Sequence, residues 1–204
     1  KKANATYRSI KGDFSAKVPS DFSFGFMANF DGRKYLPLLQ SDKSMQALLA
    51  GLNTAIDFDN IIKSVNGDML LTTSGMFDNN FDMTMLAKVP QPSWTADIGY
   101  WKQSCPSGSS ITGTDGKWIY KDNHMTFAFG LAAGTFYGTT NVAMIPADKV
   151  TYNTIDSNFQ NIMKNGRMVV FMNIGKLSSG ESLLPNGVNG LVKKLLGNSL
   201  EECL

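Results

Sequence analysis

The chain has 204 residues, of which 43% are hydrophobic and 18% are charged, a composition typical of a globular protein that buries its own core. Its formal net charge of +2 is too small, and its basic residues too scattered, to favour a nucleic acid as partner. No stretch approaches the roughly 18 uninterrupted apolar residues of a membrane-spanning helix. We therefore predict a single domain over residues 1–204.

The first third of the chain predicts one strand followed by helices. The predicted elements are a strand over 21–30 and helices over 35–39, 45–52 and 57–65. Phenylalanines alternate with small or polar residues in the strand, whereas leucines and methionines recur at three- and four-residue spacing in the helices. Asp57 lies near the positive N-terminal end of the third helix, and Asn66-Gly67 is predicted to supply the left-handed residue that ends it.

The remainder predicts mainly strands. Strands are predicted over 69–73, 81–89, 117–121, 125–131, 134–141 and 168–174, helices over 155–164 and 191–200, and loops over 104–116 and 178–190. The first two strands form a hairpin around Asp78-Asn79-Asn80, and the next three form a meander. Paired strands with clustered helices predict the α+β class, an antiparallel sheet with helices packed mainly on one face.

The sequence holds few candidates for catalysis. Its cysteines, Cys105 and Cys203, match no metal spacing, and whether they form a disulfide stays open. His124 is the only histidine. A hydrolase built from Cys105, His124 and an unidentified aspartate is conceivable. However, Cys105 lies in a flexible Pro-Ser-Gly context, with no helix N-terminus evident that would lower the pKa of its thiol. We predict no catalytic, cofactor-binding or metal-binding residue.

Two further patterns resemble known sites without completing them. Gly130, Gly134 and Gly138 lack the lysine and helix start of a phosphate loop, so we expect them to let strands bend or pack closely. Asp78, Asn80 and Asp82 are spaced like the start of a calcium loop. Because the glycine and the bidentate glutamate of such a loop are missing, we interpret them as hairpin residues.

Aromatic residues gather in the middle of the chain and allow two interpretations. They are Trp94, Tyr100, Trp101, Trp118 and Tyr120. An exposed patch of such rings would suit a carbohydrate or protein partner, whereas packing in the core is the more frequent use of such rings. We favour the core.

Four short segments carry a resemblance to a known family. They are Gly12-Asp13-Phe14, Asn29-Phe30-Asp31-Gly32, Asn66-Gly67-Asp68-Met69-Leu70-Leu71 and Met85-Leu86-Ala87-Lys88-Val89. In this order they resemble a family of uncharacterised predicted lipoproteins from Bacteroidetes, over residues 12–177. The resemblance implies an exported protein in the periplasm or at the outer membrane surface, lipid-anchored through a cysteine upstream of this fragment. It transfers no catalytic residue, and it suggests that the chain is part of a longer protein.

Our leading hypothesis is a non-enzymatic cell-envelope domain that binds a protein, a glycan or another envelope component. The first alternative is a carrier of an apolar ligand in a groove between sheet and helices, suggested by the many methionines and phenylalanines. The second is the hydrolase with Cys105 and His124. We expect no nucleic-acid partner, no cofactor, and membrane contact only through the upstream anchor.

Overall fold

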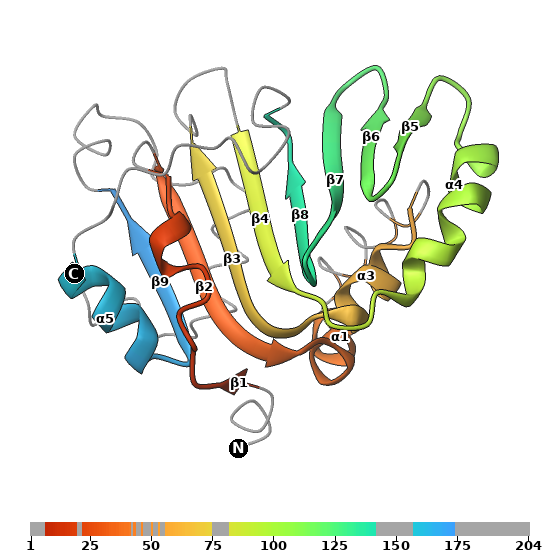
Figure 1. Cartoon of the computed structure of the whole chain (residues 1–204). Coiled ribbons are helices and arrows are strands. Elements are labelled where there is room, and N and C mark those ends of the chain that lie inside the picture. The colour runs from red at the N-terminus through yellow and green to blue at the C-terminus, as the bar shows by residue number, and fades with distance from the viewer. Residues whose placement is uncertain are drawn as a thin grey trace.

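The computed structural model describes residues 7–19, 22–41, 56–74, 82–141 and 157–173, and single residues at 43, 46, 50 and 53. These residues form one antiparallel sheet of nine strands with helices around it (Figure 1). The strands are β1 (Tyr7–Arg8), β2 (Phe24–Asp31), β3 (Asn66–Ser74), β4 (Asp82–Lys88), β5 (Ser110–Thr114), β6 (Lys117–Lys121), β7 (Thr126–Ala132), β8 (Thr135–Thr139) and β9 (Met168–Met172). The helices are η2 (Ser15–Lys17), α1 (Gly32–Gln40), α3 (Phe58–Ser64), η3 (Ser93–Asp97), α4 (Ile98–Ser104) and α5 (Ser157–Asn165). The predicted α+β fold with an antiparallel sheet is confirmed.

The strands follow the order β1-β2-β3-β4-β8-β7-β6-β5, and β9 pairs with β2 as well. Because β3 occupies one edge of β2, β1 and β9 share the other edge, end to end: β1 pairs with Asn29 and Phe30, and β9 pairs with the segment from Phe24 to Ala28. In Figure 1, α4 lies at the β5 end of the sheet and α5 at the β9 end. No described helix is long and apolar enough to cross a membrane.

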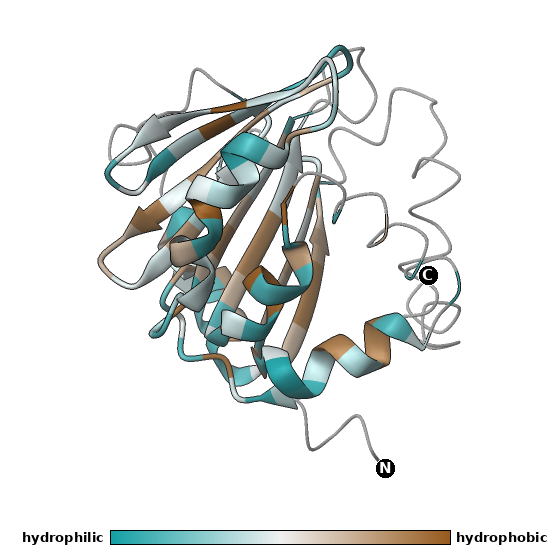
Figure 2. Ribbon diagram, turned by 90° about the vertical axis from the view of Figure 1, so that its right-hand side faces the viewer, coloured by the Kyte–Doolittle hydropathy of each residue, from teal (hydrophilic) through white to brown (hydrophobic). Residues whose placement is uncertain are grey.

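One face of the sheet, here the first face, carries the main core. The alternation predicted for β2 places Phe24, Phe26, Ala28 and Phe30 on this face, where they join one buried cluster with residues of α1, α3, η3 and α4. Trp94 lies at the centre of that cluster, fully buried. The helices show both hydrophobic and hydrophilic segments (Figure 2), as expected of elements that bury one side.

The opposite face, here the second face, is packed by different parts of the chain. Its buried cluster contains Met27, Leu70 and Leu86 from the sheet and Met163 from α5. Ile10, Phe14 and Val18 complete this cluster. They come from residues 10–19, which we call the strap and which include η2. Helices therefore lie mainly on the first face, as predicted, with α5 and η2 on the second.

Several predicted elements agree with the structure after small shifts of their ends. The strand predicted over 21–30 is β2, and Asp31 both ends it and caps α1 by accepting a hydrogen bond from the backbone N of Arg33 (3.1 Å). The predicted hairpin is β3 and β4, the meander is β6 to β8, and the helix over 155–164 is α5. The helix predicted over 191–200, the loop over 178–190 and most of the helix over 45–52 lie outside the described residues.

Three predictions are wrong in detail. Residues 104–116 contain the strand β5 rather than only a loop, because pairing with β6 stabilises a segment in which Ile111 alone is buried. The helix α3 ends at Ser64, and Gly67 lies inside β3 with a positive φ of 147° rather than in a helix cap. The strand predicted over 168–174 is β9, which ends at Met172 and in which only Phe171 is buried.

Two aromatic rings lie over glycines of neighbouring strands. Phe171 of β9 is the direct partner of Gly25, and Tyr137 of β8 is the direct partner of Gly130. A Cβ atom added to Gly25 would overlap the Phe171 ring, and one added to Gly130 would overlap the backbone oxygen of Gly116. The expectation that Gly130 allows close packing is confirmed, since the neighbouring ring fills the space of the missing side chain.

Two glycine-to-alanine substitutions are expected to change the free energy of unfolding in opposite directions. We expect Gly25→Ala to lower the free energy of unfolding by about 1–3 kcal/mol, because the Phe171 ring must move. Gly99 lies in α4 with nothing within 4 Å of an added Cβ, so Gly99→Ala should raise stability by up to about 1 kcal/mol. Urea unfolding of both variants measures this, and equal effects of the two changes would contradict the packing.

Candidate functional site

The second face has a covered half and an open half. The strap and α5 pack against the half formed by β9, β2, β3 and β4. The strand next to β8 is β7, whose Ala128 is buried on this face, and the exposed polar side chains begin beyond it. They are Ser110, Thr112 and Thr114 of β5 and Lys117 and Lys121 of β6. Ile119, between the two lysines, is half-buried. The outer part of this face, over β5 and β6, therefore carries mainly hydroxyl and ammonium groups.

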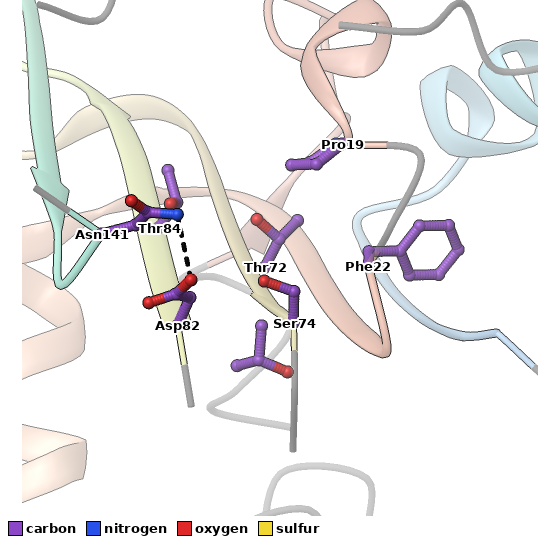
Figure 3. Close-up of a pocket in the computed structure, with 8 residues that line it drawn as sticks. Pro19, Phe22, Thr72, Ser74, Asp82, Thr84 and Asn141 are labelled. Atoms are coloured by element: carbon purple, nitrogen blue, oxygen red, sulfur yellow. Dashed lines mark hydrogen bonds between the residues drawn. The ribbon is translucent and has the colours of Figure 1, made fainter. Parts of the chain in front are cut away.

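A small polar pocket lies beside the covered half, where β3 ends and β4 begins. It is lined by Pro19, Phe22, Thr72, Thr73, Ser74, Asp82, Thr84 and Asn141 (Figure 3). Its volume is about 40 Å³, which holds one or two water molecules and is far below the several hundred Å³ of an enclosing ligand site. A ligand could therefore insert only a few atoms here, with the rest of it outside.

Hydrogen bonds fix the polar side of this pocket. Asn141 Nδ2 donates to Asp82 Oδ2 (2.9 Å), and these two side chains face each other in Figure 3. The hydroxyls of Thr84 and Thr139 are 3.0 Å apart on neighbouring strands, and Thr139 Oγ1 accepts from the backbone N of Asn141 (3.1 Å). The side chain of Thr73 alternates to the first face with its cross-strand partner Phe24, so its buried hydroxyl, which has no hydrogen-bond partner in the described part of the chain, is not counted among the pocket groups. The pocket thus offers a carboxylate, an amide and several hydroxyls within a small space.

The apolar side of the pocket comes from the chain that follows η2. Pro19 and Phe22 both line it, but the ring of Phe22 points away from the hydroxyls (Figure 3). That ring packs edge-on against Phe171, with ring centroids 5.3 Å apart. Pro19 is therefore the main apolar side chain that a ligand in the pocket would meet.

Asp68 on β3 ties the strap to the sheet. It is fully buried. Its Oδ2 accepts from the backbone N of Gly12 (2.7 Å) and Asp13 (2.9 Å), and its Oδ1 accepts from the backbone N of Lys11 (3.0 Å) and from Asn29 Nδ2 (2.7 Å). Gly12 has a φ of +85°, a backbone turn that lets successive N–H groups converge on one anion. The strap, Asn29 of β2 and β3 thus meet at one carboxylate.

Cys105 and His124 both lie near the hydrogen bond between Tyr120 and Asp122, but the structure shows no contact between the two. Tyr120 donates to Asp122 Oδ2 (2.9 Å), and Asp122 Oδ1 accepts from the backbone N of His124 and Met125. These backbone hydrogen bonds lower the pKa of Asp122. The pKa of Tyr120 is raised, first by burial and then by its hydrogen bond to Asp122, and the nearby Cys105 raises it slightly further. The aspartate therefore shapes the turn between β6 and β7.

The other candidate residues from the sequence are the central aromatic residues and the aspartate and asparagine residues of the β3–β4 hairpin. Trp94 packs against Trp101 in a stacked arrangement at 6.0 Å and against the edge of Trp118 at 5.9 Å, so the predicted core interpretation holds for the tryptophans. Tyr100 is 71% exposed. Asp78 and Asn80 lie outside the described residues. In the part of the chain that is described, no three histidine, cysteine, aspartate or glutamate side chains gather to hold a metal ion.

The pocket is the site that sequence reasoning missed. The sequence predicts Asp82 only as a hairpin residue, and Thr72, Ser74 and Asn141 give no signal, since each is an ordinary strand or loop residue. The order β3-β4-β8 brings them together, although three other strands separate β4 from β8 in the sequence. Alternation could place Thr72 and Thr84 on one face, but not beside Asn141.

The fold defines an α+β protein with one antiparallel sheet, packed by other elements on both faces, and a small polar pocket. The chain matches no family model and no curated protein. Among solved structures it is similar to crystal form IV of TP0453, with a TM-score of 0.38 and 11% identity over 79% of this chain and 54% of that chain. It is also similar to crystal form I of TP0453, with a TM-score of 0.41 and 10% identity over 74% and 50% of the two chains. The chain thus spans about half the length of the structures it matches.

Proposed function

We propose that this chain is a non-enzymatic binding domain of the cell envelope whose ligand is a glycan. The observation that supports it is the polar pocket, which is lined by a carboxylate, an amide and several hydroxyl-bearing side chains. The envelope location comes from the lipoprotein resemblance and is part of the proposal.

The chemistry of the pocket suits a ligand with adjacent hydroxyl groups. A sugar hydroxyl both donates and accepts, so a pair of neighbouring hydroxyls needs an acceptor and a donor side by side. Asp82 and Asn141 supply this pair, held 2.9 Å apart. The hydroxyls of Thr72, Ser74 and Thr84 can act in either direction. A neutral or weakly charged polyol fits this set better than an apolar ligand does.

The rest of such a chain would extend from the pocket toward β7 and β6 on the same face of the sheet. Thr139, bonded to the pocket threonine Thr84, is the cross-strand partner of Ala128 on β7. Two residues from Ala128, Thr126 lies on the same face and pairs with Lys121 of β6. Thr139 and Ala128 are buried, so a glycan leaving the pocket would meet accessible polar groups on this face only at Thr126 and Lys121.

One observation argues against turnover of a glycan and another against the apolar-ligand alternative. Hydrolysis of a glycosidic bond uses two carboxyl groups about 5 to 9.5 Å apart, and Asp82 is the single carboxylate among the described residues that line the pocket. The space between the sheet and the helices of the first face is filled by the cluster around Trp94, which gives no support to the apolar-ligand alternative.

Calorimetric titration with a panel of neutral, N-acetylated and acidic oligosaccharides tests this function. We expect at least one class to bind, and Asp82→Ala to weaken that binding by about tenfold or more, since hydrogen bonds to a charged group contribute about 1.5–3 kcal/mol. Asp13→Asn is the matched control, because Asp13 is an exposed carboxylate on the strap and should leave the affinity unchanged. Absence of binding across the panel, or equal affinity of Asp82→Ala and the unaltered protein, would contradict the proposal.

A further inference from the structure

The strap connects two features that lie apart on the second face. Its beginning is held at Asp68 by the backbone N–H groups of Lys11, Gly12 and Asp13. Its end, Pro19, lines the polar pocket. Asp68 and the pocket residue Thr72 belong to the same strand, four positions apart, which corresponds to about 13 Å along it.

The strap follows a fixed path between these two points. Phe14 and Val18 are buried against the sheet, and the ammonium group of Lys88 lies 5.7 Å from the centroid of the Phe14 ring. The turn of η2 is closed by the Ser15 hydroxyl, which donates to the carbonyl oxygen of Gly12 (2.9 Å). Buried contacts therefore accompany the strap from Gly12 toward Pro19.

The bonds at Asp68 form the polar end of this path. The carboxylate is fully buried, and its partners in the described part of the chain are all neutral N–H groups, three of them from consecutive strap residues. A buried anion is tolerated only when its hydrogen bonds are made. The strap thus has one favoured position on the sheet, in which all of these bonds form together.

We propose that Asp68 is a positioning residue for the pocket: through the strap it holds Pro19 at the pocket wall. This inference rests on the proposed function for its ligand, but the coupling it describes exists in the ligand-free protein. Coupling between two sites is reciprocal, so a change at Pro19 must also be felt at the bonds to Asp68.

The first test needs no ligand. In Pro19→Ala we expect the backbone amides of Lys11, Gly12 and Asp13 to exchange their hydrogens about tenfold faster than in the unaltered protein, as measured by NMR. In Asp68→Asn we expect the side-chain amide resonances of Asn141, across the pocket, to shift. Thr112→Ala, on the exposed face of β5, is the control and should change neither signal. Unchanged exchange in Pro19→Ala would overturn the inference even if Asp68→Asn did not fold.

The second test uses the oligosaccharide that binds best. We expect saturation with it to slow exchange at the amides of Lys11, Gly12 and Asp13, and Asp68→Asn to weaken its binding about tenfold, while Asp13→Asn has no effect. Binding without added protection of these amides would overturn the positioning role and leave the proposed function intact. Coupling in the ligand-free protein, together with no binding of any oligosaccharide, would support the positioning role of Asp68 and contradict the proposed function.

Discussion

Asp68→Asn is expected to lower the free energy of unfolding by about 2–5 kcal/mol, because hydrogen bonds to a charged group contribute about 1.5–3 kcal/mol each and a buried donor left without an acceptor costs about 1–3 kcal/mol. The asparagine would place an N–H₂ group where the carboxylate now accepts from three backbone N–H groups of the strap and from Asn29. At least one of these buried donors would then lack an acceptor. Urea unfolding followed by circular dichroism measures the loss.

A matched pair of carboxylates separates this effect from a change of net charge. Asp13→Asn removes the same charge from an exposed side chain that lies next to the same bonds, and it should change stability by less than about 0.5 kcal/mol. If both variants lost the same stability, the hydrogen bonds at Asp68 would not be the cause. A loss below about 1 kcal/mol in Asp68→Asn would mean that the strap docks through its apolar residues alone.

Trp94→Ala should cost about 3–5 kcal/mol, as truncation of a large buried aromatic side chain does. The indole is fully buried and contacts Trp101, Trp118, Phe129 and Phe136, whose ring centroids lie 5.9 to 6.4 Å from its own. Its Nε1 also donates to the hydroxyl of Ser64 on α3 (3.2 Å). Its removal therefore leaves a cavity where η3, α3 and the sheet meet.

Tyr100→Ala provides the comparison for Trp94. Tyr100 belongs to α4, directly after η3, but 71% of its surface is exposed, so its loss should change stability by no more than about 0.5 kcal/mol. Thermal unfolding with near-ultraviolet circular dichroism reports both the stability and the aromatic packing. A small effect of Trp94→Ala would show that the first-face core does not depend on this ring.

The sequence predicts those parts of the fold that local pattern determines. The alternating phenylalanines of β2 and the hairpin of β3 and β4 have a periodicity that one segment shows by itself. The strand β5 escapes this reasoning, because Ser110, Thr112 and Thr114 are exposed and a lone Ile111 gives no alternation. Its structure comes from its partner β6, and an edge strand needs little apolar surface of its own.

The site is less predictable than the fold for a physical reason. Asp68 has no neighbour in the sequence that marks it as buried; its partners lie in residues 11–13 and at Asn29. The pocket likewise joins Pro19, Asp82 and Asn141, which only the strand order brings together. The predicted candidates Cys105 and His124 are chemically the most conspicuous residues, and the structure records no contact between them.

The shared edge of β2 has a consequence for how the chain folds during synthesis. β9 pairs with residues 24–28, near the other end of the described chain, and the backbone N of Ile10 donates to the carbonyl oxygen of Gly166 (2.9 Å). Contacts so distant in sequence form slowly, since a long loop must close first. A ribosome that has not yet released residue 172 therefore holds a chain in which part of β2 has no partner on one edge, and this is the stage at which a chaperone or a neighbouring nascent chain could pair with it.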